Sequence, residues 1–161
     1  MKGFTNMRKI GSLLFVVCLL LLMTGNSLAQ SKQVEASRKF DEFSGVNCED
    51  LEARLDNFAI QLQSHPELLG YIIIYGGNHD KRGQARAWIG RTKYYLSSTR
   101  GVDAGRFIII MGGYRENWAM ELWLLQSNAP KPIAKPTLQI KDVKFKKGRI
   151  PRAQYRHCGE I

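Results

Sequence analysis

Two similar apolar strings place the strongest limit on what this 161-residue chain can fold into. Residues 71–75 read Tyr-Ile-Ile-Ile-Tyr before Gly76-Gly77, and residues 107–111 read Phe-Ile-Ile-Ile-Met before Gly112-Gly113. Both strings are β-branched or aromatic almost throughout, which is typical of strands buried on both faces. Their similarity indicates neighbouring strands in similar surroundings, and each glycine pair is expected to end its strand.

Two helices are predicted, one before and one after the strand at residues 71–75. Asn47 is expected to cap the first helix, with Asp50 three residues on, and Pro66 ends it. Its apolar residues recur at helical spacing: Leu51, Leu55, Phe58, Ala59 and Leu62. The second helix covers residues 85–96 and has one apolar face, which includes Trp88. Its basic residues, Arg86, Arg91 and Lys93, are predicted to lie on the opposite, exposed surface.

Two further strands complete the predicted fold. Residues 39–43 alternate apolar and charged side chains, and residues 118–125 follow a short polar turn that favours pairing with the strand before it. The order is then β-α-β-α-β-β. Because strands that alternate with helices need crossover connections, we predict an α/β fold of two layers: one mixed sheet with both helices on one face.

The first 29 residues have the three parts of a secretory signal peptide. Lys2, Arg8 and Lys9 precede an apolar run, residues 10–23, and Ser27-Leu28-Ala29 offers a cleavage site before Gln30. The alternative, a membrane anchor, needs about 20 apolar residues. The sequence therefore predicts an exported protein, periplasmic or secreted, with no stable membrane anchor after cleavage. Cys18 lies inside the apolar run, which disfavours a lipid anchor.

Removal of the signal leaves Cys48 and Cys158, and two cysteines in an exported chain favour one disulfide. The bridge would close a loop of about 110 residues and stabilise the fold by about 4–5 kcal/mol. Such a bridge would tie the C-terminal end back over the first helix. A metal pair is the weaker alternative, because neither cysteine has a second ligand at metal-binding spacing.

The predicted domain runs from residue 39 to 127, after a polar leader of residues 30–38. Closely spaced prolines in residues 128–137 indicate an extended spacer. Residues 138–161 form a basic tail: residues 128–161 carry 9 basic and 2 acidic groups, a balance of +7 in a chain whose net charge is +10. Nucleic acid is not an expected partner, because export makes anionic envelope polymers or lipid headgroups better candidates, and a simply solvated tail is the plainest interpretation.

The order of elements and several strings resemble the OmpA-like peptidoglycan-associated domain, a module shared with the C-terminal part of MotB. The resemblance covers about residues 40–125. The strings that carry it are Phe40-Asp41-Glu42-Phe43, Ser64-His65-Pro66, Gly77-Asn78-His79-Asp80 with Gly83, Tyr95-Leu96, Arg100-Gly101-Val102-Asp103, Arg106 and Gly112.

The resemblance implies a non-enzymatic module that binds diaminopimelate of the peptidoglycan stem peptide through an aspartate and an arginine. Asp80 matches the aspartate, but the family's arginine position falls on Trp88. An indole cannot replace the paired hydrogen bonds of a guanidinium, so Arg86 or Arg91 would have to substitute. Asp80 also has a plainer interpretation as a turn residue. The alternative is a fold that lost peptidoglycan binding and serves as a periplasmic protein-interaction domain.

A ligand is expected outside the carboxyl ends of the central strands. This places Asn78, His79 and Asp80 beside the start of the second helix, and Tyr114 and Arg115 are predicted at the same edge. Such a set suits a zwitterionic peptide end, although two polar turns that merely adjoin would give the same pattern.

No constellation in the sequence indicates catalysis, a metal or a cofactor. The three histidines (His65, His79 and His157) are scattered, the glycine pairs lack the ending of a phosphate-binding loop, and no nucleophile elbow is present. We therefore expect a protein that is not an enzyme and uses no cofactor. Its expected partner is peptidoglycan, another envelope component or an envelope protein.

Overall fold

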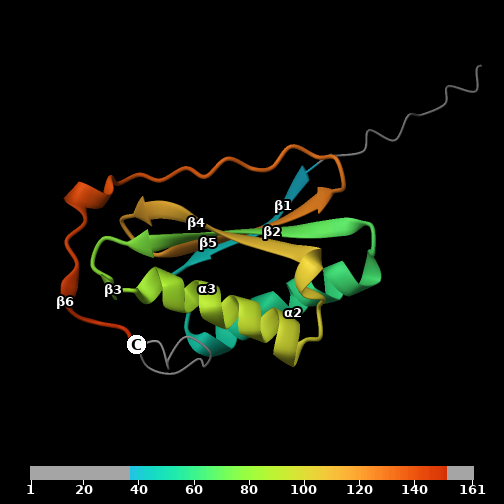
Figure 1. Cartoon of the computed structure of the whole chain (residues 1–161), viewed down its shortest axis with the longest axis horizontal. Coiled ribbons are helices and arrows are strands. Elements are labelled where there is room, and N and C mark those ends of the chain that lie inside the picture. Colours follow the sequence, from blue (N-terminus) through green and yellow to red (C-terminus); the bar gives the residue numbers. More distant parts are fainter. Residues whose placement is uncertain (1–36, 152–161) are drawn as a thin grey trace, which may run out of the picture. The chain divides into compact units, whose positions relative to one another are not determined.

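The computed structural model describes residues 37–151 (Figure 1). A four-stranded sheet has the order β1-β5-β2-β4, and a small two-stranded sheet pairs β3 with β6. The strands are β1 (Ser37–Ser44), β2 (Leu68–Gly77), β3 (Lys81–Arg82), β4 (Phe107–Arg115), β5 (Ala119–Gln126) and β6 (Lys146–Arg149). The helices are α2 (Cys48–Ser64) and α3 (Gln84–Tyr94), with single turns at Tyr95–Thr99, Ala104–Arg106 and Ile140–Asp142. The predicted mixed α/β fold is confirmed.

The sheet has a mixed topology. β2 pairs with β4 in parallel, and β5 lies between β1 and β2, antiparallel to both. The prediction that β5 pairs with β4 is therefore wrong. β5 is buried on both faces along most of its length, so a central position hides more of its surface than the edge beside β4.

Both helices cover one face of the sheet, the helix face (Figure 1). Asn47 caps α2 as predicted, because its Oδ1 accepts the Asp50 N–H at 2.8 Å. All five predicted apolar positions of α2 are buried, among them Leu55 and Phe58. Each such side chain contributes about 1.5–3 kcal/mol on burial, so packing against the sheet decides where this helix lies.

Gly76 and Gly77 are the last two residues of β2, so this pair ends its strand as predicted, whereas Gly112 and Gly113 lie inside β4, which continues to Arg115. A Cβ on Gly112 would lie 2.5 Å from Cγ2 of Ile73, and one on Gly76 would lie 2.7 Å from Cε1 of Tyr114. Side chains of the neighbouring strand therefore lie across these glycines, and this close approach explains why no larger residue fits.

The opposite face of the sheet, the outer face, is crossed by residues 128–138, which we call the strap (Figure 1). Ala129 and Ala134 pack on an outer core formed by Tyr71, Ile73, Tyr75, Ala119 and Leu125. The Lys135 N–H donates to the Tyr75 hydroxyl at 3.0 Å, and Leu138 forms a bridge with Tyr114. The strap is extended, but its interpretation as a spacer beyond the domain is wrong, because the apolar outer face needs a cover.

Residues 139–150, the closing segment, continue from the strap to the loop after β2. The Lys146 N–H donates to the Asp80 carbonyl at 3.1 Å, and the Ile150 N–H donates to the Arg82 carbonyl at 3.0 Å. Ile150 is buried. The part of the basic tail that the structure describes is therefore packed against the domain, which extends past the predicted boundary at residue 127.

Three sequence predictions lie outside the described residues: the signal peptide, the polar leader over residues 30–36, and the position of Cys158. Cys48 is the first residue of α2, and its pairing with Cys158 stays a prediction. Among residues 37–151, no helix is long and apolar enough to span a membrane.

Candidate functional site

A pocket of about 610 Å³ lies between the start of α3, the end of β4 and the closing segment. Four of its lining side chains are cationic, one is a carboxylate, and most of the others are apolar. The lining residues are Asp80, Lys81, Arg82, Gly83, Gln84, Ala85, Arg86, Ile89, Met111, Gly113, Tyr114, Ile140, Phe145 and Arg149. A volume in this range is typical of sites for small ligands or for the end of a larger one.

Aromatic contacts join the closing segment to the sheet at this pocket. Phe145 packs edge-on against Tyr114, with ring centroids 5.6 Å apart, and the Arg82 guanidinium lies 4.6 Å from the Phe145 ring centroid. Arg82, Arg86 and Arg149 are exposed. The pocket thus has apolar walls and a basic rim, a combination suited to a ligand with an anionic group on an apolar body.

Asp80 supplies the carboxylate among the described lining residues, and it is half-buried. Its Oδ2 accepts the Gly77 N–H at 2.8 Å, the contact expected of a turn residue. Burial raises the pKa of the Asp80 carboxyl, against the opposing effects of this hydrogen bond and of Lys146. Within residues 37–151, Oδ1 accepts no hydrogen bond.

The neighbours of Asp80 have different roles. Asn78 is buried; its Nδ2 donates to the Glu116 carboxylate at 3.1 and 3.2 Å, and its Oδ1 accepts the Lys144 N–H at 2.9 Å. These bonds hold the loop after β2 against the β4–β5 turn and the closing segment. His79 is exposed and does not line the pocket. Asn78 therefore does not line the pocket but holds the loop next to it in place.

Arg86 and Arg91, the two candidate substitutes on the second helix, lie in different surroundings. Arg86 is exposed and lines the pocket. Arg91 is 4% exposed, its guanidinium lies 5.1 Å from the Trp88 ring centroid, and burial lowers its pKa. Its predicted place on an exposed basic surface is wrong, because the cation packs on an indole that is itself buried. Trp88 stacks on Trp118, with ring centroids 4.7 Å apart.

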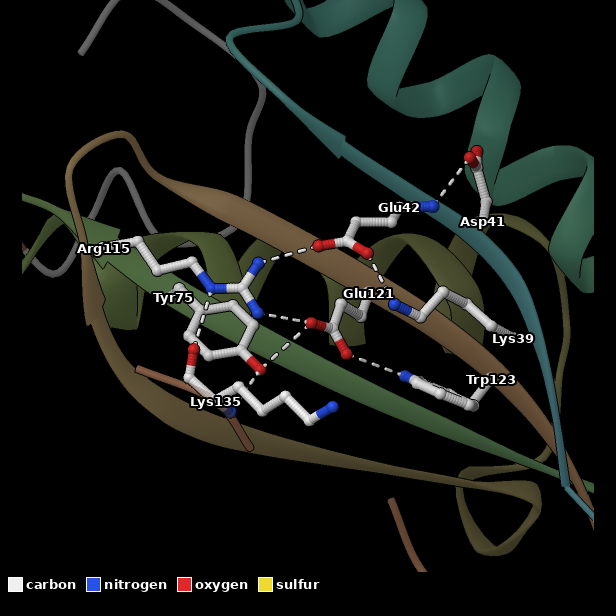
Figure 2. Close-up of polar contacts among 8 residues, drawn as sticks. All are labelled: Lys39, Asp41, Glu42, Tyr75, Arg115, Glu121, Trp123 and Lys135. Carbon is white, nitrogen blue, oxygen red and sulfur yellow. Dashed lines mark hydrogen bonds and ion pairs between the residues drawn. The ribbon is translucent and has the colours of Figure 1, made fainter. Parts of the chain in front are cut away.

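Arg115 lies at the predicted end of the sheet, where it pairs with Gly77, but its side chain lies on the outer face (Figure 2) and does not line the pocket with Asp80. Its Nη2 lies 2.5 Å from Glu121 Oε1, its Nη1 lies 2.8 Å from Glu42 Oε1, and its Nε donates to the Lys135 carbonyl at 3.2 Å. The guanidinium also lies 3.6 Å from the Tyr75 ring centroid. These groups form what we call the outer-face network.

The charges of the outer-face network are paired with one another. Glu121, only 4% exposed, accepts hydrogen bonds from Arg115, from the Tyr75 hydroxyl at 3.1 Å and from Trp123 Nε1 at 3.0 Å. Burial alone would lower the pKa of Arg115, but its bonds to Glu42 and Glu121 outweigh it and raise that pKa. A satisfied network under the strap has a structural role, and its charges need no ligand.

Several pocket residues were missed by the sequence interpretation, chiefly Lys81, Arg82, Met111, Phe145 and Arg149. The basic run at residues 146–149 is the available signal, but the sequence pattern places it in a basic tail beyond the domain. Met111, the last residue of an apolar string, is 38% exposed. Its exposure could not be predicted before the strand was known to lie at an edge of the sheet.

No family model, curated protein or solved structure matches this chain. Among residues 37–151, no group of three or more His, Cys, Asp or Glu side chains could hold a metal ion. The site's geometry and chemistry are therefore the basis for a proposed function.

Proposed function

We propose that this chain is an exported, non-enzymatic binding module of the bacterial cell envelope, whose pocket holds the charged end of a peptidoglycan stem peptide. The observation that carries the proposal is that Asp80 and Arg86 line the same pocket. The free end of diaminopimelate bears an ammonium and a carboxylate on a short apolar chain. A carboxylate and a guanidinium on apolar walls complement these three parts.

The charge balance of the pocket supports the same ligand class. Four cations against one carboxylate favour a ligand with more negative than positive groups. A stem peptide meets this condition, because it carries its own terminal carboxylate beside that of diaminopimelate. Asp80 Oδ1 would accept the ammonium, and Arg86 would hold a carboxylate with two parallel hydrogen bonds.

The test is a titration of the mature protein with a diaminopimelate-containing muropeptide, followed by amide chemical shifts. We expect perturbations at residues 77–92, 113–116 and 145–149. A muropeptide with lysine in place of diaminopimelate lacks one carboxylate and is the control ligand, which should bind more weakly. Arg86→Ala should weaken binding, and Arg38→Ala, which removes an equal charge from exposed β1, should leave it unchanged. Unchanged spectra at millimolar muropeptide would refute the proposal.

A second candidate is an OmpA-like fold that has lost peptidoglycan binding and serves as a periplasmic protein-interaction domain. The position of Trp88 favours it, because this buried indole occupies the place of the family's ligand-binding arginine. Pull-down on purified peptidoglycan separates the two candidates, with Asp80→Ala as the control. Retention of the wild type and loss of the variant support the first candidate, and no retention of either supports the second.

A further inference from the structure

The outer edge of β4 is open. On its other side β4 pairs with β2, but within the described part of the chain only Tyr114 has a backbone partner on the outer edge: its carbonyl accepts the Thr137 and Leu138 N–H groups at 3.0 Å. Alternate residues of an edge strand direct their N–H and C=O groups away from the sheet. Residues 107–112 therefore present main-chain donors and acceptors that another strand could use.

The two edge strands of the sheet, β1 and β4, differ in how well they are protected against pairing with a further strand. β1 carries Arg38, Lys39, Asp41 and Glu42 and has an irregular register between Lys39 and Asp41. Charges and bulges of this kind discourage the addition of another strand. Residues 107–111 of β4 carry no charge and no proline, and they pair in regular register with residues 70–74. Of these two edges, only that of β4 is suited to accept a further strand.

The open edge leads into the basic pocket. Met111, Gly113 and Tyr114 belong to β4 and also line the pocket, opposite Arg86 and Ile89 of α3. β4 runs toward the end of the sheet where β3 and β6 lie (Figure 1). A strand that paired with β4 in parallel would therefore deliver its C-terminal end to the pocket.

We infer that the β4 edge and the pocket together bind the C-terminus of an extended polypeptide, which adds a parallel strand to β4. The basic rim, with Arg82, Arg86 and Arg149, would hold the terminal carboxylate. The last side chain would be apolar, because Met111, Ile140 and Phe145 form the adjoining walls. Main-chain bonds would supply affinity and the pocket would supply selection for a free carboxyl end.

Charge selects this occupant over a second copy of the chain. In a two-fold dimer β4 would pair antiparallel with itself, so each basic rim would lie near the start of the other strand, which Arg106 precedes. Such a dimer would place no negative charge at the basic rim, whereas a polypeptide that ends in a carboxylate would neutralise part of the rim's positive charge. A polypeptide end is a different ligand from a stem peptide. The inference rests on the proposed function in one respect, that the same pocket binds a carboxylate. The ligand it names is a polypeptide end that requires the sheet edge.

The experiment uses the mature protein and an acetylated hexapeptide of alternating threonine and valine that ends in valine with a free carboxylate. Matched peptides are the controls: the C-terminal amide, and two versions N-methylated at alternate residues, one in each register. Isothermal titration should show that amidation and at least one N-methylation pattern each weaken binding by roughly tenfold or more. Amide shifts should appear at residues 107–114 as well as at 82–89. Because the changes are in the ligand, the folding of the protein is not at issue.

Each outcome decides between the claims. If both N-methylated patterns bind as well as the parent peptide, strand addition is wrong. If the amide binds equally, the carboxylate has no role and the inference fails. If a muropeptide binds but the hexapeptide does not, the inference fails and the proposed function stands; the reverse result supports the inference alone. Dimerisation of the protein without peptide, with shifts at residues 107–112, would mean that a second copy takes the edge and would overturn the inference.

Discussion

Tyr114 and Arg115 are adjacent in the sequence, yet they belong to two regions of opposite character. The Tyr114 ring lines the pocket beside α3, where the basic rim faces solvent. The Arg115 guanidinium lies in the outer-face network under the strap, between two carboxylates and the Tyr75 ring (Figure 2). Both regions contain arginine and an inner carboxylate, so composition alone does not separate them.

The difference lies in how far the charges are neutralised. In the outer-face network Arg115 is matched by Glu42 and Glu121, and the inner carboxylate has three donors. In the pocket four cations face one carboxylate. Paired and buried charges hold a fold together, whereas unmatched exposed charges can recruit a ligand. Substitutions in the first region should therefore change stability, and those in the second should change binding.

The largest effect is expected at Glu121. Glu121→Ala removes the buried partner of Arg115, Tyr75 and Trp123, and loss of one member of such a group costs about 3–5 kcal/mol of unfolding free energy. Glu42→Ala is the matched control, because this more exposed carboxylate pairs with the same guanidinium and should cost about 0–1 kcal/mol. Urea denaturation measures both. Equal losses would show that burial does not distinguish the two carboxylates.

The next effect is expected at Tyr75, whose hydroxyl joins the network to the strap. Tyr75→Phe removes a donor to Glu121 and the acceptor of the Lys135 N–H, at a cost of about 1–3 kcal/mol. Hydrogen exchange should show faster exchange at Lys135, while the affinity of the pocket for a muropeptide should not change. Tyr71→Phe is the control, because Tyr71 belongs to the same outer core and its hydroxyl forms no hydrogen bond within residues 37–151. An unchanged exchange rate at Lys135 would contradict the role of the Tyr75 hydroxyl.

In the pocket the expected effect is on binding. Arg86→Ala should alter the unfolding free energy by no more than about 0.5 kcal/mol, because the side chain is exposed. It should weaken carboxylate ligands by roughly tenfold, the value of one charge-assisted pair. Calorimetric titration and urea denaturation of the same sample measure the two quantities. A large loss of unfolding free energy with unchanged ligand affinity would show that Arg86 has a structural role and would contradict the distinction between the two regions.

The smallest effect concerns the pH dependence at Asp80. Because burial raises the pKa of this carboxyl in the folded state, the stability it contributes is present below its unfolded pKa of about 3.8 and is lost as pH rises through the folded value. Asp80→Asn keeps an oxygen for the Gly77 N–H but cannot ionise. The wild type should therefore lose stability relative to this variant as pH rises from about 3 toward neutrality. Thermal unfolding across this range is the measurement, and a relative gain by the wild type would contradict the prediction.

The elements that could be predicted correctly from the sequence are those whose signals are local. The cap at Asn47, the spacing of Leu51 to Leu62 and the uniform apolar character of residues 71–75 depend on neighbours within one or two turns or along one strand. Asp80 and Arg86 could be assigned to one site for a similar reason, because both flank the start of the same helix. Patterns of this kind act over a few residues and can be read directly.

The partners that the elements take could not be predicted in this way, because they depend on the assembled fold. The insertion of β5 between β1 and β2 depends on the apolar surface of the whole sheet, and the docking of the strap depends on an outer face that exists only after the strands have paired. The same applies to Arg115, which left the predicted site because Glu42 and Glu121, distant from each other in sequence, meet beside it. Charge neutralisation and the burial of apolar area are properties of assembled surfaces, and for this reason no local pattern in the chain encoded them.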